Sequence, residues 1–279
     1  MTELAGLLLV RHGQSVGNVA NDNARAAGAH RLDLDHRDAD TPLSESGVGQ
    51  ARAVGTWLGG LPEDALPTVW LTSPYRRAAD TATAALEAAG GSAAGGRASG
   101  TRLLTDERLR ERDLGILDGF TGRGIRERYP EEAERRDRIG KFYYRPPGGE
   151  SWTDVLLRVR YLLTDLRQQY AGERVCVFSH QAVIMCFRVA LEQLDEEEVL
   201  RVDREDPLPN CSVTIYHPAG HNPGRHESVG HESVGHESVG HHPGSAGLEL
   251  HSYADTTAVE RGHAPTTRES PSGNEEAAR

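Results

Sequence analysis

Short apolar runs recur along the first 180 residues, and helical patterns separate them. The runs cover residues 7–10, 68–72, 102–104 and 174–178. Continuous apolar runs of this length are typical of strands buried on both faces of a sheet, and helices between such strands favour parallel pairing. We therefore predict an α/β domain of three layers, in which a mostly parallel central sheet is flanked by helices on both faces.

Helical signals fill the intervals between the runs. Ser44 precedes residues 47–58 as a helix cap, and Ser73-Pro74 opens an Ala-rich helix that stops at Gly90-Gly91. Apolar residues within 154–170 recur at amphipathic spacing. Residues 111–149 are irregular and rich in arginine, which predicts short helices that cap a site. The last strand is expected at residues 212–216.

A change of composition at His217 divides the chain. We predict a folded domain over residues 1–216 and a disordered tail over 217–279, because the tail is rich in His, Gly, Ser and Glu and repeats the unit Gly-His-Glu-Ser-Val near residues 225–240. Nine of the 13 histidines lie in this tail. We expect no specific metal site there, because no fixed geometry would hold the ligands.

Charge, the first ten residues and the cysteines indicate which class of protein to expect. The net charge is −11, and the tail carries nine acidic against four basic side chains, which leaves the body at about −6. No Lys or Arg run predicts a nucleic-acid face. Residues 1–10 lack the basic flank of a signal peptide and the length of a membrane span, so we predict a soluble cytoplasmic protein. Three cysteines without paired spacing are expected to be reduced thiols.

The first apolar run ends in residues suited to phosphoryl chemistry. Arg11, His12 and Gly13 follow it directly, and Asn18 lies five residues further on. A neutral imidazole is a good nucleophile for phosphorus, because it has a free lone pair at neutral pH and forms a reactive phosphoramidate. Arg11 offers a planar fork of donors for phosphoryl oxygens. The Asn18 side chain and the Gly13 backbone are expected to add neutral donors.

Residues 7–18, LLLVRHGQSVGN, resemble the signature of the histidine phosphatase superfamily, the group that includes the cofactor-dependent phosphoglycerate mutases. The resemblance extends over about residues 7–191. It implies a phosphoglycerate mutase-like fold, a phosphohistidine intermediate on His12, and chemistry that needs neither a metal nor a cofactor. Arginines and histidines then supply the positive charge that a magnesium ion would otherwise provide.

Two further segments resemble motifs of this superfamily. Residues 71–82, LTSPYRRAADTA, resemble the motif in which an arginine early in a helix grips the phosphate, which implies that role for Arg76 and leaves Arg77 as its solvated neighbour. A helix start also favours an anion. Residues 175–181, VCVFSHQ, end a buried strand in the second histidine, which implies that His180 contacts the transferring phosphoryl group.

The general acid lies in a segment with several candidates. Residues 106–115 hold four acidic side chains, and composition does not choose among them. The superfamily pattern implies Glu111, with Glu107 as its rival. A donor carboxyl must keep its proton near neutral pH, so we expect the flanking Arg110 and Arg112 to turn away from the site.

The resemblance leaves the branch open. Gln181-Ala182 replaces the Gly-Asn that commonly follows this histidine in the mutases and resembles the fructose-2,6-bisphosphatase branch, which favours a phosphomonoester hydrolase. A phosphoglycerate mutase is the alternative, and a noncatalytic phosphoprotein-binding module is a third possibility. The substrate is expected to be a small phosphorylated metabolite or a phosphoprotein. Gln181, Glu150 and Tyr143 are candidates for contact with it.

Overall fold

The structure, a computed structural model, describes residues 3–90, 103–220 and 247–268. In this part of the chain six strands form one sheet in the order β3-β2-β4-β1-β5-β6. They are β1 (Gly6–Arg11), β2 (Val69–Thr72), β3 (Leu103–Thr105), β4 (Arg174–Ser179), β5 (Val213–Pro218) and β6 (Leu248–Asp255). Strands β1 to β4 pair in parallel, and β5 pairs antiparallel with both β1 and β6. The predicted mostly parallel sheet is confirmed.

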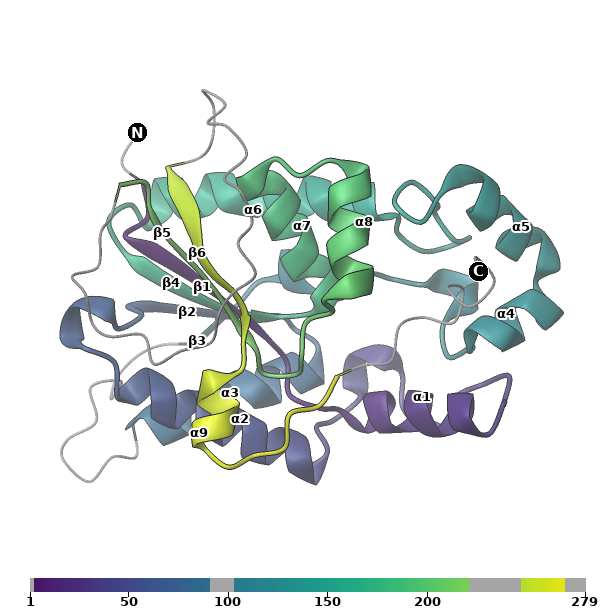
Figure 1. Cartoon of the computed structure of the whole chain (residues 1–279), viewed down its shortest axis with the longest axis horizontal. Helices are drawn as coiled ribbons and strands as arrows, with labels where there is room; N and C mark the ends of the chain where they lie inside the picture. The colour runs from purple at the N-terminus through teal and green to yellow at the C-terminus, as the bar shows by residue number, and fades with distance from the viewer. Residues whose placement is uncertain (1–2, 91–102, 221–246, 269–279) are drawn as a thin grey trace.

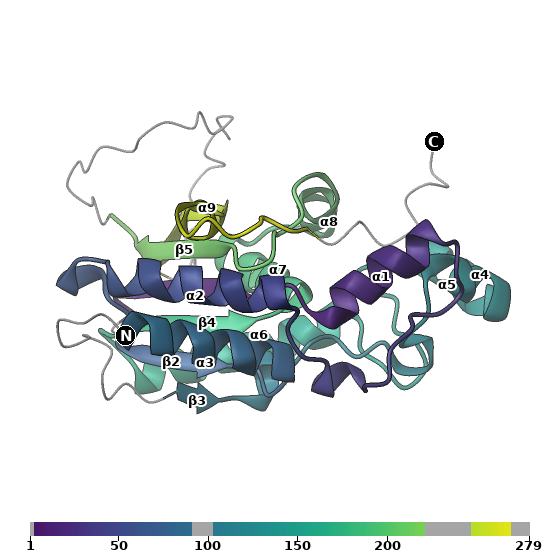
Figure 2. The same ribbon diagram turned by 90° about the horizontal axis from the view of Figure 1, so that it is seen from below.

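Helices cover both faces of the sheet (Figures 1 and 2). One face carries α2 (Glu45–Gly59), α3 (Arg76–Gly90) and α9 (Thr257–Arg261), and the other carries α6 (Trp152–Gln169), α7 (Gln181–Glu192) and α8 (Glu196–Glu205). Helices on both faces of the sheet confirm the predicted three-layer arrangement. Ser44 caps α2 as predicted, because its side chain accepts a hydrogen bond from the Gly47 N–H.

The core explains why β1 is apolar without alternation. Leu7 and Leu9 join the hydrophobic cluster under α6 and α7, whereas Leu8 and Val10 join the cluster under α2 and α3. Full burial of each such side chain stabilises the fold by about 1.5–3 kcal/mol. Because both faces of β1 are buried, the polar residues at its end are held in a rigid frame.

A smaller helical region lies beyond the carboxyl end of β1 (Figure 1). It contains α1 (Val16–Ala26), α4 (Gly122–Arg128) and α5 (Pro130–Ile139), together with a short 3-10 helix, η1 (Asp38–Asp40). The short helices expected in residues 111–149 are present. Three further 3-10 turns lie at Glu63–Ala65, Glu107–Leu109 and Gly115–Leu117.

The prediction of a disordered tail from residue 217 is wrong for its described part. After β5, the chain returns as β6 along the sheet edge and continues into α9. Leu248 and Val259 are buried in the two core clusters, and the Asn210 N–H donates to the Thr267 carbonyl oxygen at 2.9 Å. Few apolar residues suffice to hold β6 in the fold, because it lies at the edge of the described sheet and pairs there with β5. The pentapeptide repeats lie outside the described residues.

Three smaller expectations concern membrane-spanning helices, the cysteines and the start of helix α3. In the described part of the chain, no helix combines the length and the apolar character that crossing a membrane requires. Cys176, Cys186 and Cys211 are buried free thiols, as expected, and burial raises the pKa of Cys186 to about 12. Helix α3 begins at Arg76 rather than at Pro74, because the Ser73 hydroxyl first accepts the Tyr75 N–H in a turn.

Candidate active site

Two histidines meet where neighbouring parallel strands end. Arg11 in β1 pairs in register with Ser179 in β4, so the next residues, His12 and His180, lie side by side. Their ring centroids are 5.2 Å apart, and both side chains are buried. The carboxyl ends of the strands open into a cleft of about 570 Å³ that His12 lines. This is the usual position for ligands in open α/β sheets.

The hydrogen bond of His12 fixes its tautomer. Nδ1 lies 2.8 Å from the Gly13 carbonyl oxygen, which only accepts, so Nδ1 carries the proton and Nε2 has the lone pair. Burial, and then the positive charges of Arg77 and Arg11, hold the pKa of His12 well below its usual 6.5. His12 is therefore a neutral imidazole with a nucleophilic Nε2 at pH 7.

One ring nitrogen of His180 is hydrogen-bonded, and the other, which is also buried, has no hydrogen-bond partner among the described residues. Its Nε2 lies 2.8 Å from the Ser73 hydroxyl, and its Nδ1 lies 3.7 Å from Oε2 of Glu111. Burial is the main cause of its lowered pKa, followed by the charge of Arg77. The ring of Tyr75 packs edge-on against it at 5.4 Å. His180 is thus an uncharged, rigidly placed neighbour of the nucleophile.

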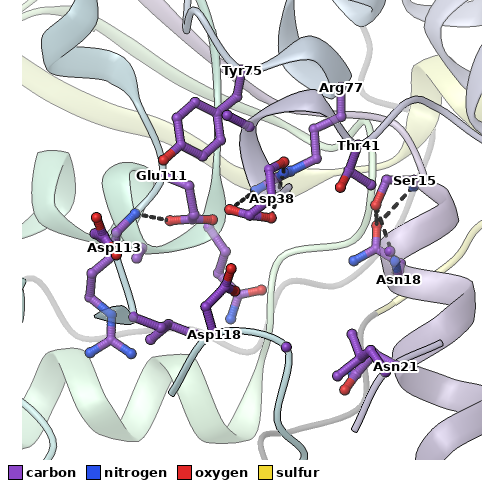
Figure 3. A pocket seen from close by; sticks show the side chains of 18 of the residues that line it. Ser15, Asn18, Asn21, Asp38, Thr41, Tyr75, Arg77, Glu111, Asp113 and Asp118 are labelled. Carbon is purple, nitrogen blue, oxygen red and sulfur yellow. Dashed lines mark hydrogen bonds and ion pairs between the residues drawn. The ribbon is translucent and has the colours of Figure 1, made fainter. Parts of the chain in front are cut away.

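The structure exchanges the predicted positions of two adjacent arginines. Arg77 is buried, lines the cleft and points toward Asp38 (Figure 3). The Arg76 side chain is 56% exposed and forms an ion pair with Asp80 at 3.4 Å. The expectation that Arg76 faces the site and Arg77 faces solvent is wrong, because successive helix residues point about 100° apart. The signal was present in the sequence: Arg77 lies four residues before Thr81, on the buried stripe of small residues in α3.

Arg11 lies beneath the cleft rather than in its wall. Its side chain is 1% exposed, and Nη1 donates to the Leu208 carbonyl oxygen. It is not among the residues that line the cleft. Its charge nevertheless contributes to the low pKa of His12, so Arg11 adds a fixed positive charge below the nucleophile.

Glu111 reaches the cleft from the loop after β3. Its Oε1 accepts the Arg112 N–H at 2.7 Å, and its carboxylate borders the cleft (Figure 3). Arg110 turns away and pairs with Glu150, as expected, whereas Arg112 lines the cleft, contrary to expectation. Glu107, the rival candidate, does not line it.

Gly13 and Asn18 differ in how they meet the prediction. Asn18 is buried and lines the cleft, and its carboxamide oxygen accepts from the Ser15 N–H and hydroxyl. The Gly13 N–H donates to the Thr81 hydroxyl at 3.0 Å, so the expected backbone donor is already used. A Cβ on Gly13 would lie 2.6 Å from the Gly47 carbonyl oxygen, so glycine permits a close approach of two chain segments.

Of the three candidates for substrate contact, one faces the cleft. Gln181 lines it, and its Nε2 donates to Asp203 at 2.8 Å. Glu150 is instead bound by Arg110 and Arg158 outside the cleft, which contradicts the prediction. Tyr143 is 54% exposed and packs on Phe142, so it does not reach the site either.

Three further cleft residues were not singled out from the sequence. Tyr75 lies within the segment 71–82, whereas Asp38 and Asp118 lie outside the motifs, and the fold brings the three together (Figure 3). Burial raises the pKa of Tyr75 to about 12, so it stays a hydroxyl donor. Burial, and then the charge of Asp38, raise the pKa of Asp118. Within the described residues, no group of three His, Cys, Asp or Glu side chains is arranged to hold a metal ion.

The fold and the cleft define a class of α/β protein in which two buried histidines and two arginines meet at the carboxyl end of a parallel sheet. Residues 7–227 match the histidine phosphatase superfamily (branch 1). The chain belongs to this superfamily.

The similar proteins span both activities of the group. The chain is 34% identical over 208 residues to a 2,3-bisphosphoglycerate-dependent phosphoglycerate mutase 2 of Gloeobacter violaceus, which covers 74% of this chain and 84% of that protein. It is 30% identical to a fructose-2,6-bisphosphatase of Saccharomyces cerevisiae, over 68% of this chain and 35% of that protein. The structure of a mycobacterial glucosyl-3-phosphoglycerate phosphatase is similar, with 29% identity, a TM-score of 0.57, and coverage of 77% and 90%.

Proposed function

We propose that this protein is a metal-independent phosphomonoester hydrolase that passes the phosphoryl group of its substrate through His12. The observation that carries the proposal is the state of His12: buried, uncharged, and fixed with its Nε2 lone pair as the only free ring nitrogen. A nucleophile of this kind needs no activating base.

In the first step, Nε2 of His12 attacks phosphorus and the P–O ester bond breaks. Protonated Glu111 gives its proton to the departing oxygen, so the alcohol leaves neutral. The imidazole then carries the phosphoryl group on Nε2 and keeps its Nδ1 proton on the Gly13 carbonyl oxygen. In the second step, Glu111 takes a proton from water, the hydroxide attacks phosphorus, and the N–P bond breaks to return the lone pair to His12.

Fixed positive charge stabilises the phosphoryl group in both steps. Arg77 lies in the wall of the cleft and Arg11 beneath its floor, and both charges reach His12. His180 is uncharged in the empty site, and an arriving dianion would raise its pKa and let it donate. Asn18 adds neutral donors from its NH2 group. Stabilisation by such preorganised groups commonly supplies most of the catalysis in phosphoryl transfer.

Hydrolysis is favoured over transfer by the residue after His180. Gln181 places a carboxamide at the cleft, bound to Asp203, where the mutases commonly carry Gly-Asn. A phosphoglycerate mutase is the second candidate, because two mutases are 34% and 36% identical to this chain, against 30% for the fructose-2,6-bisphosphatase. A binding module without turnover would not need both His12 and Glu111. We propose a small phosphorylated metabolite as substrate, and action in the cytoplasm, where three buried free thiols would stay reduced.

Phosphate release from p-nitrophenyl phosphate, sugar phosphates and phosphoglycerates, with a chelator present, tests the proposal. Wild type is compared with His12→Ala and with a matched control, His30→Ala, whose half-exposed side chain pairs with Glu127. Turnover that survives the chelator and His30→Ala but disappears in His12→Ala supports the hydrolase. Isomerisation of primed monophosphoglycerate without phosphate release would establish the mutase instead.

A further inference from the structure

In the cleft, the acidic residue Asp38 binds Arg77, the arginine that we propose as a ligand of the phosphoryl group. Arg77 Nη1 donates to the Asp38 carbonyl oxygen at 2.7 Å and to its Oδ1 at 2.8 Å, and Nη2 lies 3.2 Å from Oδ2. Three of the five guanidinium N–H donors thus serve a single residue. Figure 3 shows the two side chains pointing toward one another, with dashed lines between them.

The charge of Asp38 also reaches other groups in the cleft. It contributes, after burial, to the raised pKa of Tyr75 and of Asp118. A phosphoryl group bound at His12 would meet the same negative charge, because Arg77 also acts on His12. A carboxylate and a phosphate oxygen are alternative partners for one planar fork of donors.

The segment that carries Asp38 is able to yield. No residue of 31–40 is buried, and η1 contributes no side chain to the core. By contrast, Arg77 is held in place by α3, with its side chain only 7% exposed against 41% for Asp38. When the two separate, Asp38 can move while the guanidinium stays where its charge acts on His12.

We propose that Asp38 is an internal competitor for Arg77, which occupies the guanidinium in the empty cleft, weakens the binding of product phosphate and thereby speeds its departure. This proposal rests on the proposed function, because it takes Arg77 as a ligand of the phosphoryl group. A purely structural Asp38 would have the opposite effect, since losing it would disorder Arg77 and weaken phosphate binding.

Calorimetric titration of the full chain with inorganic phosphate separates these roles. Asp38→Asn removes the charge but keeps the shape, Asp38→Ser removes both, and Asp40→Asn is the matched control, because Asp40 lies in the same 3-10 helix and pairs with Arg37 at 2.7 Å. We expect both Asp38 variants to bind phosphate about three- to fivefold more tightly than wild type. Asp40→Asn should bind as wild type does. In turnover, the Asp38 variants should show a lower KM and stronger inhibition by phosphate.

Equal or weaker phosphate binding in the Asp38 variants would overturn the competitor role while leaving the hydrolase intact. An Arg77→Ala variant tests whether phosphate binds at Arg77 at all. Wild-type binding of phosphate that Arg77→Ala abolishes sustains the site on which the proposal depends. Binding that Arg77→Ala leaves unchanged would remove the proposed phosphate site, and the role of Asp38 with it.

Discussion

Replacing each of two adjacent arginines should change kcat/KM by amounts that differ by orders of magnitude. Arg77→Ala removes a buried guanidinium from the wall of the cleft, whereas Arg76→Ala removes an exposed side chain with one ion pair to Asp80. Loss of one preorganised charged donor group costs about 3–4 kcal/mol of transition-state stabilisation, or about 10²- to 10³-fold in kcat/KM. Loss of an exposed helical ion pair costs about 0.5 kcal/mol of stability and should change kcat/KM less than about twofold.

A second readout distinguishes electrostatics from misfolding. The positive charge of Arg77 helps to hold the pKa of His12 below 6.5, so its removal should raise that pKa and move the acid limb of kcat/KM to higher pH. The assay is hydrolysis of p-nitrophenyl phosphate from pH 4 to 9, with thermal unfolding measured on both variants. A greater loss of kcat/KM in Arg76→Ala than in Arg77→Ala would refute this assignment of the pair.

Three further predictions concern other parts of the molecule. Glu111→Gln should lower kcat about 10²- to 10⁴-fold for alkyl phosphates, whose leaving groups need a proton, and an equal effect on phosphoryl transfer from p-nitrophenyl phosphate would contradict the role of acid. His12 and His180 have lowered pKa values in the folded state, so the unfolded state binds more protons below about pH 6.5. The free energy of unfolding should therefore decrease as the pH is lowered, by up to about 2.7 kcal/mol per pH unit for the two histidines together. Urea unfolding at several pH values checks this, and a free energy that stays constant between pH 6.5 and 5.5 would be incompatible with buried neutral histidines. Val259→Asp should destabilise the protein by about 3 kcal/mol or more, since it buries a charge in the cluster under α2, and an unchanged melting temperature would mean that α9 is not part of the fold.

The sequence predicted those site residues whose position follows from a strand end. His12 and His180 each follow a buried apolar run directly. Because such runs leave little freedom of register, the two histidines could be expected at the carboxyl ends of strands in the same sheet. The roles of Arg76 and Arg77 could not be read from the motif alone, because the phase of α3 depends on the turn that Ser73 makes before it. The spacing of the small residues along α3 does indicate which face of the helix is buried, and Arg77 lies on that face.

Residues far from strands were harder to place. Glu150 is a candidate for substrate contact in the sequence, yet two arginines bind it outside the cleft. Asp38 lies in a surface segment without regular pattern, and only the fold brings it to Arg77. The return of the chain as β6 was hidden because an edge strand needs few apolar residues, and the repeats before it dominate the composition.

Detection of the covalent intermediate tests the central claim most directly. Wild type and Glu111→Gln would be mixed with p-nitrophenyl phosphate, whose leaving group needs no proton, quenched in alkali, which preserves phosphohistidine, and digested for mass spectrometry. The account predicts one phosphoryl group per chain, on His12, which accumulates in Glu111→Gln because attack by water is slowed. Steady turnover without phosphorylated His12, or a phosphoryl group found on His180 instead, would contradict it.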